Sequence, residues 1–122
     1  MSENEQRGDT DRVGISDESR LLLDEMMADG FFKDAVDAYR LAAAQAIAKN
    51  IDIGTHSVKR EGHMYLISQV DPDHVFGEVI SARFPKYGRN RYRALEKFAD
   101  VGMRLLKEHI EKNGALDFWK TE

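Results

Sequence analysis

Apolar residues alternate with polar ones near the start of the chain. Within residues 11–16, Val13 and Ile15 alternate with Arg12 and Gly14, and this period of two predicts a short strand. A single strand leaves backbone hydrogen bonds unmade. The predicted strand must therefore pair with a later segment of the chain or with a second copy of it.

From Ser16 onward, apolar residues recur every three to four positions, as in amphipathic helices. We expect Ser16 to be the N-cap of a first helix that Gly30 ends. A second helix is expected over about residues 33–49, with Asn50 as its left-handed terminator. The expected buried face of this second helix is rich in alanine, which favours close approach of another helix: Ala35, Val36, Tyr39, Ala42, Ala43, Ala46 and Ile47.

The second half of the chain predicts two more helices. Residues 63–70 are rich in strand formers but too few to distinguish a strand from a helix. Asp71 has the sequence context of an N-cap and predicts a third helix over about residues 72–83. A fourth and longest helix is expected over about residues 90–112. Gly102 in its middle costs about 1 kcal/mol relative to alanine, which predicts a close crossing with another backbone.

A chain of 122 residues, 42% hydrophobic and 33% charged, suits one folded domain. We divide it into a disordered acidic arm (1–10), a single domain (11–114, with a first part at 11–50 and a helical extension at 51–114) and a tail (115–122). The tail carries the only tryptophan, Trp119, which is expected to dock on a neighbouring surface.

Composition excludes several classes of chemistry. Without cysteine there is no disulfide scaffold, thiolate zinc site or cysteine nucleophile. The net charge of −4 gives no overall basic field for nucleic acid, and residues 1–34 hold ten acidic and four basic residues. The start of the chain is polar, and its most apolar window, residues 41–48, is far shorter than the roughly 18 residues of a membrane span. We expect a cytoplasmic protein with no membrane contact.

The order of strand, capped helix, glycine turn and alanine-rich helix over residues 11–49 resembles the ribbon-helix-helix family of the Arc, MetJ and CopG type. That resemblance covers about a third of the chain and implies a homodimer whose paired strands enter the DNA major groove. An ordinary strand–helix–helix start of an α+β domain explains the same residues. Of the outward ribbon positions only Arg12 is long enough to reach a base edge, and Lys33 at the second helix is followed by the acidic Asp34.

A second feature is the basic stretch over residues 83–93, where three aromatic residues lie among five cations: Arg83, Lys86, Arg89, Arg91 and Arg93. Cations neutralise phosphates and aromatic rings stack on bases, so this is the best nucleic-acid candidate in the chain. The same stretch suits an acidic protein partner or the acidic arm of this chain. A solvated loop with Tyr92 in the core is the structural alternative.

Metal binding and catalysis have little support in the sequence. His74 and Glu78 lie one helical turn apart, but a third ligand would have to come from distant His56, His63 or His109. Helix capping explains the nearby acids better. No nucleophile elbow, phosphate-binding glycine loop or zinc-protease motif occurs. We expect no enzyme, no metal and no cofactor.

Over most of its length the chain is similar to small bacterial proteins encoded beside DNA phosphorothioation systems. The residues that carry this resemblance lie at 30–33, 37–44 and 98–106. It implies an accessory protein of genome modification or defence and supplies no catalytic residues.

Together these patterns predict a mainly α protein with one or two short strands, built as a ribbon-helix-helix-like dimer core plus C-terminal helices. The leading hypothesis is a DNA-associated accessory or regulatory protein. Arg12 and Lys33 would approach one duplex region, and the basic stretch over residues 83–93 another. The alternative is a protein-interaction adaptor or antitoxin-like subunit that does not bind DNA.

Overall fold

The computed structural model describes residues 9–114, and for residues 60–63 it describes the backbone alone. The predicted arm, apart from Asp9 and Thr10, and the tail with Trp119 lie outside the described residues.

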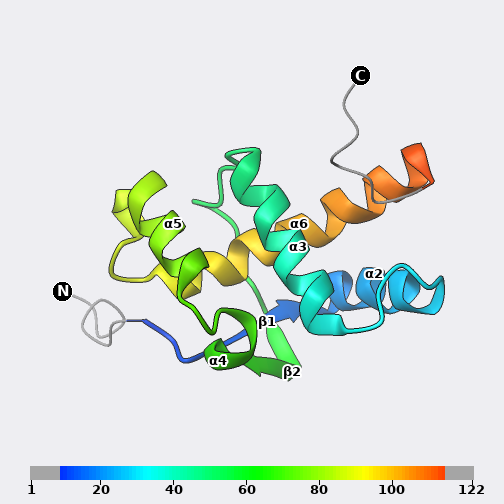
Figure 1. Ribbon diagram of the computed structural model, residues 1–122, viewed down its shortest axis with the longest axis horizontal. Helices are drawn as coiled ribbons and strands as arrows, with labels where there is room; N and C mark the ends of the chain where they lie inside the picture. Colours follow the sequence, from blue (N-terminus) through cyan, green and yellow to red (C-terminus); the bar gives the residue numbers. More distant parts are fainter. Residues whose placement is uncertain (1–8, 115–122) are drawn as a thin grey trace.

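The described chain is mainly helical with a two-stranded antiparallel sheet, which confirms the coarse fold prediction. Its elements follow in the order β1 (Arg12–Ser16), α2 (Asp17–Ala28), α3 (Ala35–Ala48), β2 (Arg60–Leu66), α4 (Ile67–Val70), α5 (Val75–Arg83), the 3-10 turn η1 (Pro85–Tyr87) and α6 (Arg91–Asn113). Figure 1 shows α6 running along the long axis of the molecule, with α3 crossing it and α5 at one end. Among the described helices, none is both long and apolar enough to cross a membrane.

The first two helices have the ends that local sequence predicts. The Ser16 hydroxyl accepts a hydrogen bond from the Ser19 amide at 3.3 Å, so Ser16 caps α2. Gly30 follows α2 with a φ of +83°, and Asn50 follows α3 with a φ of +54°. Asp34 caps α3, because its carboxylate accepts from the Val36 amide. The helix consequently starts at Ala35, two residues later than predicted.

The third predicted helix starts later than expected. The sequence predicts a start at about residue 72, but α5 begins at Val75, and its N-cap is His74 in the left-handed region with a φ of +60°. Asp71 still satisfies the start of this helix from a distance. Its buried carboxylate accepts from the amides of Phe76 and Gly77 at 3.0 Å each. The prediction of Asp71 as the N-cap is therefore wrong, because a turn closed by the bond from the His74 amide to the Asp71 carbonyl separates Asp71 from the helix, although its carboxylate still binds the first amides of α5.

Gly102 lies where α6 crosses α3. A Cβ at this position would sit 1.9 Å from the carbonyl oxygen of Ala42, well inside van der Waals contact. The predicted close crossing is confirmed, and the alanines of α3 explain it, since Ala42, Ala43 and Ala46 are fully buried there. This crossing forms the centre of the core.

The predicted strand pairs within its own chain. β1 is antiparallel to β2, with Val13 opposite Tyr65 and Gly14 opposite Met64. The residues at 63–70 therefore divide between the end of β2 and the short α4.

The other edge of β1 lies against α6 and α3. The Gly14 amide donates to Glu96 at 2.7 Å, and the Ser16 amide donates to Asp100 at 2.8 Å. The Tyr39 hydroxyl donates to the Gly14 carbonyl at 2.9 Å. Along this edge, side chains therefore provide hydrogen bonds to the backbone of β1, as β2 does along the other edge.

Candidate functional site

The five predicted cations of residues 83–93 lie at one end of the molecule, where α5 ends and α6 begins (Figure 1). We call this set the basic corner: Arg83, Lys86, Arg89, Arg91 and Arg93. Arg83, Lys86 and Arg89 are exposed, whereas Arg91 and Arg93 are half-buried. The first three therefore offer their charge to a partner most directly.

The aromatic rings of the same stretch turn inward. Phe84 packs against Phe98 with 5.2 Å between ring centroids and against Tyr87 with 6.4 Å. Tyr92 is buried. These rings belong to the core, as the structural alternative predicted for Tyr92. Phe84 and Tyr87 are half-buried and pack against the core, so they offer less ring surface for base stacking than exposed rings would.

The inward rings do order the cations above them. Each of three cations lies over the ring of the next residue: Arg83 over Phe84 at 5.7 Å, Lys86 over Tyr87 at 5.2 Å and Arg91 over Tyr92 at 6.0 Å. Arg83 also donates to the Asn50 side chain at 2.5 Å. In each contact the charged end of the side chain itself lies over the ring, so the rings help to fix the positions of these cations.

An acidic residue of the arm already occupies part of this corner. Asp9 accepts hydrogen bonds from the amides of Tyr92 at 2.7 Å and Arg93 at 2.9 Å. Asn90 makes no side-chain cap, so Asp9 supplies the negative charge that the N-terminus of α6 favours. The alternative in which the stretch contacts the acidic arm of the same chain is thus present in the structure at Asp9.

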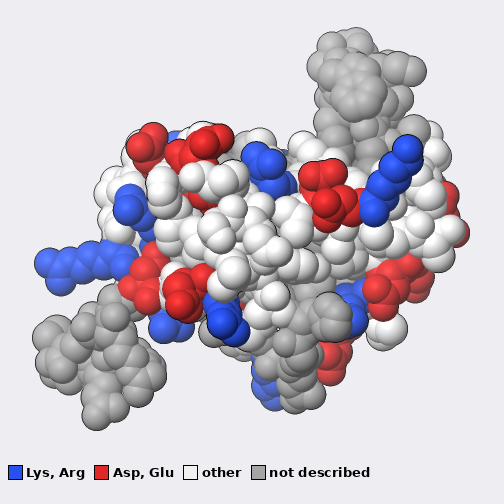
Figure 2. Space-filling view, turned by 60° about the horizontal axis from the view of Figure 1, so that its bottom comes forward, with Lys and Arg blue, Asp and Glu red and all other residues white. Residues whose placement is uncertain are grey.

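The remaining predicted cations do not all join the corner. Arg12 is exposed at the start of β1. Lys33 is exposed in the connection between α2 and α3, directly before Asp34, the N-cap of α3. On the face in Figure 2, basic and acidic side chains are interspersed and form no continuous basic surface. The structure therefore separates Lys33 from the other candidates.

The residues considered for a metal site serve the N-terminus of α5. His74 Nδ1 lies 3.1 Å from the Tyr92 hydroxyl, which donates to Asp71 at 2.8 Å. Burial, together with the hydrogen bond to Asp71, raises the pKa of Tyr92 to about 12. His56 lies elsewhere, against Asp100, and the His63 side chain is outside the described residues. Within the described part of the chain no three potential ligands gather.

Sequence reasoning missed a polar cleft around Asp100, where the loop after α3 meets α2 and α6. The cleft has a volume of about 420 Å³. Asp100 is 4% exposed and accepts from the amide and hydroxyl of Ser16, and His56 Nε2 lies 2.7 Å from its other oxygen. Ser19 donates to the Asp100 carbonyl. These bonds tie four segments together, and they use both carboxylate oxygens.

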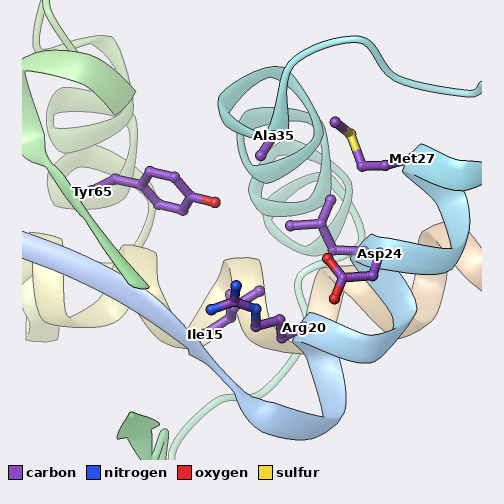
Figure 3. Close-up of a pocket in the computed structure, with 7 residues that line it drawn as sticks. Ile15, Arg20, Asp24, Met27, Ala35 and Tyr65 are labelled. Atoms are coloured by element: carbon purple, nitrogen blue, oxygen red, sulfur yellow. The ribbon is translucent and has the colours of Figure 1, made fainter. Parts of the chain in front are cut away.

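Sequence reasoning also missed the Tyr65 pocket, a hollow of about 260 Å³ between β1, β2, α2 and α3 (Figure 3). It is lined by Ile15, Arg20, Leu23, Asp24, Met27, Ala35 and Tyr65. Figure 3 shows the Tyr65 hydroxyl pointing from β2 toward the side of α2 that carries Arg20 and Asp24. The spacing of Arg20 and Asp24, one helical turn apart, was the only signal of this pocket in the sequence.

The Tyr65 hydroxyl stays a hydrogen-bond donor at neutral pH. Burial raises its pKa, Arg20 opposes that shift, and Asp34 and Asp24 add to it. The ring is held edge-on against Tyr39, with 5.3 Å between centroids. Tyr39 is in turn fixed by its bond to Gly14. The donor in the pocket is thus held in place by the core behind it.

Comparisons with known proteins give no further guide to the site. No family model, no curated protein and no solved structure matches this chain.

Proposed function

We propose that this protein is a DNA-associated accessory or regulatory protein that contacts the duplex backbone through the basic corner. The observation that carries the proposal is the exposure of Arg83, Lys86 and Arg89 together at one end of the molecule. Cations at this spacing neutralise phosphates and release counterions. The inward rings favour contact with phosphates over stacking on bases.

The test measures binding to a labelled random-sequence duplex by fluorescence anisotropy at about 50 and 200 mM salt. We expect affinity to fall steeply with salt. Replacing Arg83, Lys86 and Arg89 by alanine should lower the slope of log K against log salt by about 3. Arg91 and Arg93 are left intact in this variant because they are half-buried beside the Asp9 cap.

The matched control removes three exposed cations elsewhere, Arg40, Arg104 and Lys112. It changes the net charge by the same amount, so it reports the general electrostatic effect. An equal loss of affinity in both variants would contradict the assignment of the corner. Absence of binding by the unchanged protein at the lower salt would contradict DNA binding itself.

The ribbon-helix-helix homodimer is a narrower form of the proposal. In such a dimer two β1 strands pair along the edge that carries the amides of Gly14 and Ser16. These amides donate to Glu96 and Asp100 of the same chain, so a ribbon dimer requires both carboxylates to release β1. Sedimentation equilibrium tests this form, since a monomer at concentrations that saturate DNA would exclude it.

A bacterial DNA-modification or defence setting is also a narrower form. It rests on the resemblance at residues 30–33, 37–44 and 98–106. Two of these stretches contain the crossing of α3 and α6 at Ala42 and Gly102, so packing alone gives those residues a role. To test this setting, the gene that encodes this protein is deleted in a host with an active phosphorothioation system, and the sulfur content of the DNA is measured. A change in sulfur content would support the setting.

A second candidate is an adaptor for an acidic protein partner, without DNA binding. The observation that favours it is Asp9, because a carboxylate already binds the start of α6 among the corner cations. Salt-sensitive binding to an acidic peptide, lost in the Arg83, Lys86 and Arg89 variant while duplex binding is absent, would support this candidate over the first.

A further inference from the structure

Three polar side chains that line the Tyr65 pocket have no partner among the residues that the structure describes. Within the described part of the chain, the Arg20 guanidinium, the Asp24 carboxylate and the Tyr65 hydroxyl make no side-chain hydrogen bond or ion pair. Arg20 and Tyr65 are half-buried, so water reaches them only in part, whereas Asp24 is exposed at the rim. A polar group held in this way gains free energy when a ligand supplies the missing partner.

This pocket differs from the other polar sites of the molecule. The carboxylates of Asp9, Asp71 and Asp100 each accept two or more hydrogen bonds from the chain itself. These hydrogen bonds stabilise the fold and leave fewer acceptor sites for a ligand. Arg20, Asp24 and Tyr65 keep their bonding capacity available, and all three converge on one hollow (Figure 3).

The rest of the pocket is apolar. Ile15 and Leu23 are buried in it, and Met27 and Ala35 complete the wall. A hollow with an apolar wall and a few convergent polar groups is the usual form of a small-molecule site. A ligand that fits must therefore carry an apolar group together with charges that match the rim.

The rim holds both signs of charge. A carboxylate alone would pair with Arg20 but meet repulsion from Asp24, and an ammonium alone would meet the reverse. A zwitterion satisfies both. We propose that the Tyr65 pocket binds an α-amino acid with an apolar side chain: its carboxylate pairs with Arg20 and accepts from the Tyr65 hydroxyl, and its ammonium pairs with Asp24.

The size of the hollow agrees with this class of ligand. A cavity of about 150 Å³ holds benzene, and drug-sized ligands occupy about 300 Å³ or more. The Tyr65 pocket, at about 260 Å³, lies between these limits. Leucine, methionine and phenylalanine fall in that range, and their side chains match the apolar wall.

Isothermal titration calorimetry of the whole protein with L-leucine, L-methionine and L-phenylalanine tests the proposal. We expect saturable 1:1 binding of at least one of them. Two analogues of leucine then separate the charges: 4-methylpentanoate lacks the ammonium, and 3-methylbutylamine lacks the carboxylate. Each should bind about tenfold more weakly or worse, since a charged hydrogen bond is lost.

Substitutions identify the site. Arg20→Gln and Asp24→Asn should each weaken amino-acid binding about tenfold or more, and Tyr65→Phe by a smaller factor of about three. Arg40→Gln and Asp37→Asn remove the same charges from exposed positions of α3 and should leave binding unchanged. Thermal melting without ligand confirms that each variant is folded.

Three results would overturn the proposal. The first is no heat of binding with any of the three amino acids at millimolar concentration. The second is an analogue that binds as tightly as leucine. The third is a loss in Arg40→Gln or Asp37→Asn as large as in the pocket variants. None of these depends on DNA binding, because the basic corner shares no residue with the pocket.

Discussion

Two regions of the molecule contain similar residue types but differ in packing and in how their charged side chains are bonded. One is the junction of β1, α3 and α6, and the other is the Tyr65 pocket. In the first, Gly102 leaves no room for a single added atom, and the carboxylates of Glu96 and Asp100 bond to the backbone of β1. In the second, a hollow remains, and Arg20 and Asp24 make no ion pair among the described residues.

The difference distinguishes charged groups that stabilise the fold from charged groups that can bind a ligand. A buried charge that is fully bonded tells little about function, since its partners account for it. Arg20 is a half-buried charge without a partner among the described residues, which requires another explanation, and a ligand is one. Two experiments test this contrast directly, and two more test single bonded groups of the closed region and its surroundings.

The largest expected effect comes from adding one carbon in the closed region. Gly102→Ala places a Cβ 1.9 Å from the Ala42 carbonyl oxygen and must push α3 and α6 apart. We expect a loss of about 3–5 kcal/mol in the free energy of unfolding, measured by urea denaturation. Ala35→Met adds a longer side chain at the open pocket and should change stability by less than about 1 kcal/mol. Equal losses would break the contrast.

The second experiment compares two carboxylates. Asp100→Asn removes the negative charge beside the Ser16 amide and hydroxyl, which share one carboxylate oxygen, and replaces the oxygen beside His56 Nε2 by an NH2 group. A loss of about 1–3 kcal/mol in the free energy of unfolding is expected, because buried hydrogen bonds to a charged acceptor become bonds to a neutral one. Asp24→Asn should stay within about 0.5 kcal/mol. Chemical denaturation of both variants, side by side, decides whether bonding inside the protein predicts the cost.

The sequence predicts what local chemistry determines. The Ser16 cap, the left-handed Asn50 and the crossing at Gly102 each follow from a residue and its near neighbours, and each is confirmed. The basic corner also follows, because its cations are contiguous in the chain.

What the sequence does not reveal depends on residues far apart in the chain. The pairing of β1 with β2, the Asp9 cap on α6 and the Tyr65 pocket join segments separated by about 40–80 positions. The late start of α5 has a different cause, since Asp71 bonds to amides five and six residues ahead. Sequence rules for helix capping consider only a residue directly before the helix, so they place the start of α5 too early.

The third experiment tests the cap that the arm supplies. Asp9→Ala removes the acceptor for the Tyr92 and Arg93 amides at the start of α6. Loss of an N-cap carboxylate costs about 1 kcal/mol. Asp11→Ala is the control, since Asp11 is exposed and its recorded tertiary bond uses only its backbone carbonyl. Hydrogen exchange should show faster opening of the first turn of α6 in Asp9→Ala alone, and unchanged exchange there would contradict the cap.

The smallest effect concerns pH. The pKa of Tyr92 is raised to about 12, so the folded protein keeps this proton while the unfolded chain loses it near 10. Because the unfolded state then binds fewer protons, stability should fall as pH rises from about 10 to 12. Absorbance titration near 295 nm should show a tyrosine step near pH 12 that belongs to Tyr92, later than that of an ordinary tyrosine. Its persistence in Tyr92→Phe would show that the step belongs to another tyrosine.

The hydrogen bonds of β1 also set the order in which this protein can assemble. Gly14 and Ser16 bond to residues 82 and 84 positions later in the chain, and Asp9 bonds to residues 83 and 84 positions later. Contacts of such high sequence separation close the longest loops and form late. During translation the first strand must wait for the last helix to leave the ribosome. The protein therefore completes its fold only after most of its chain has been made.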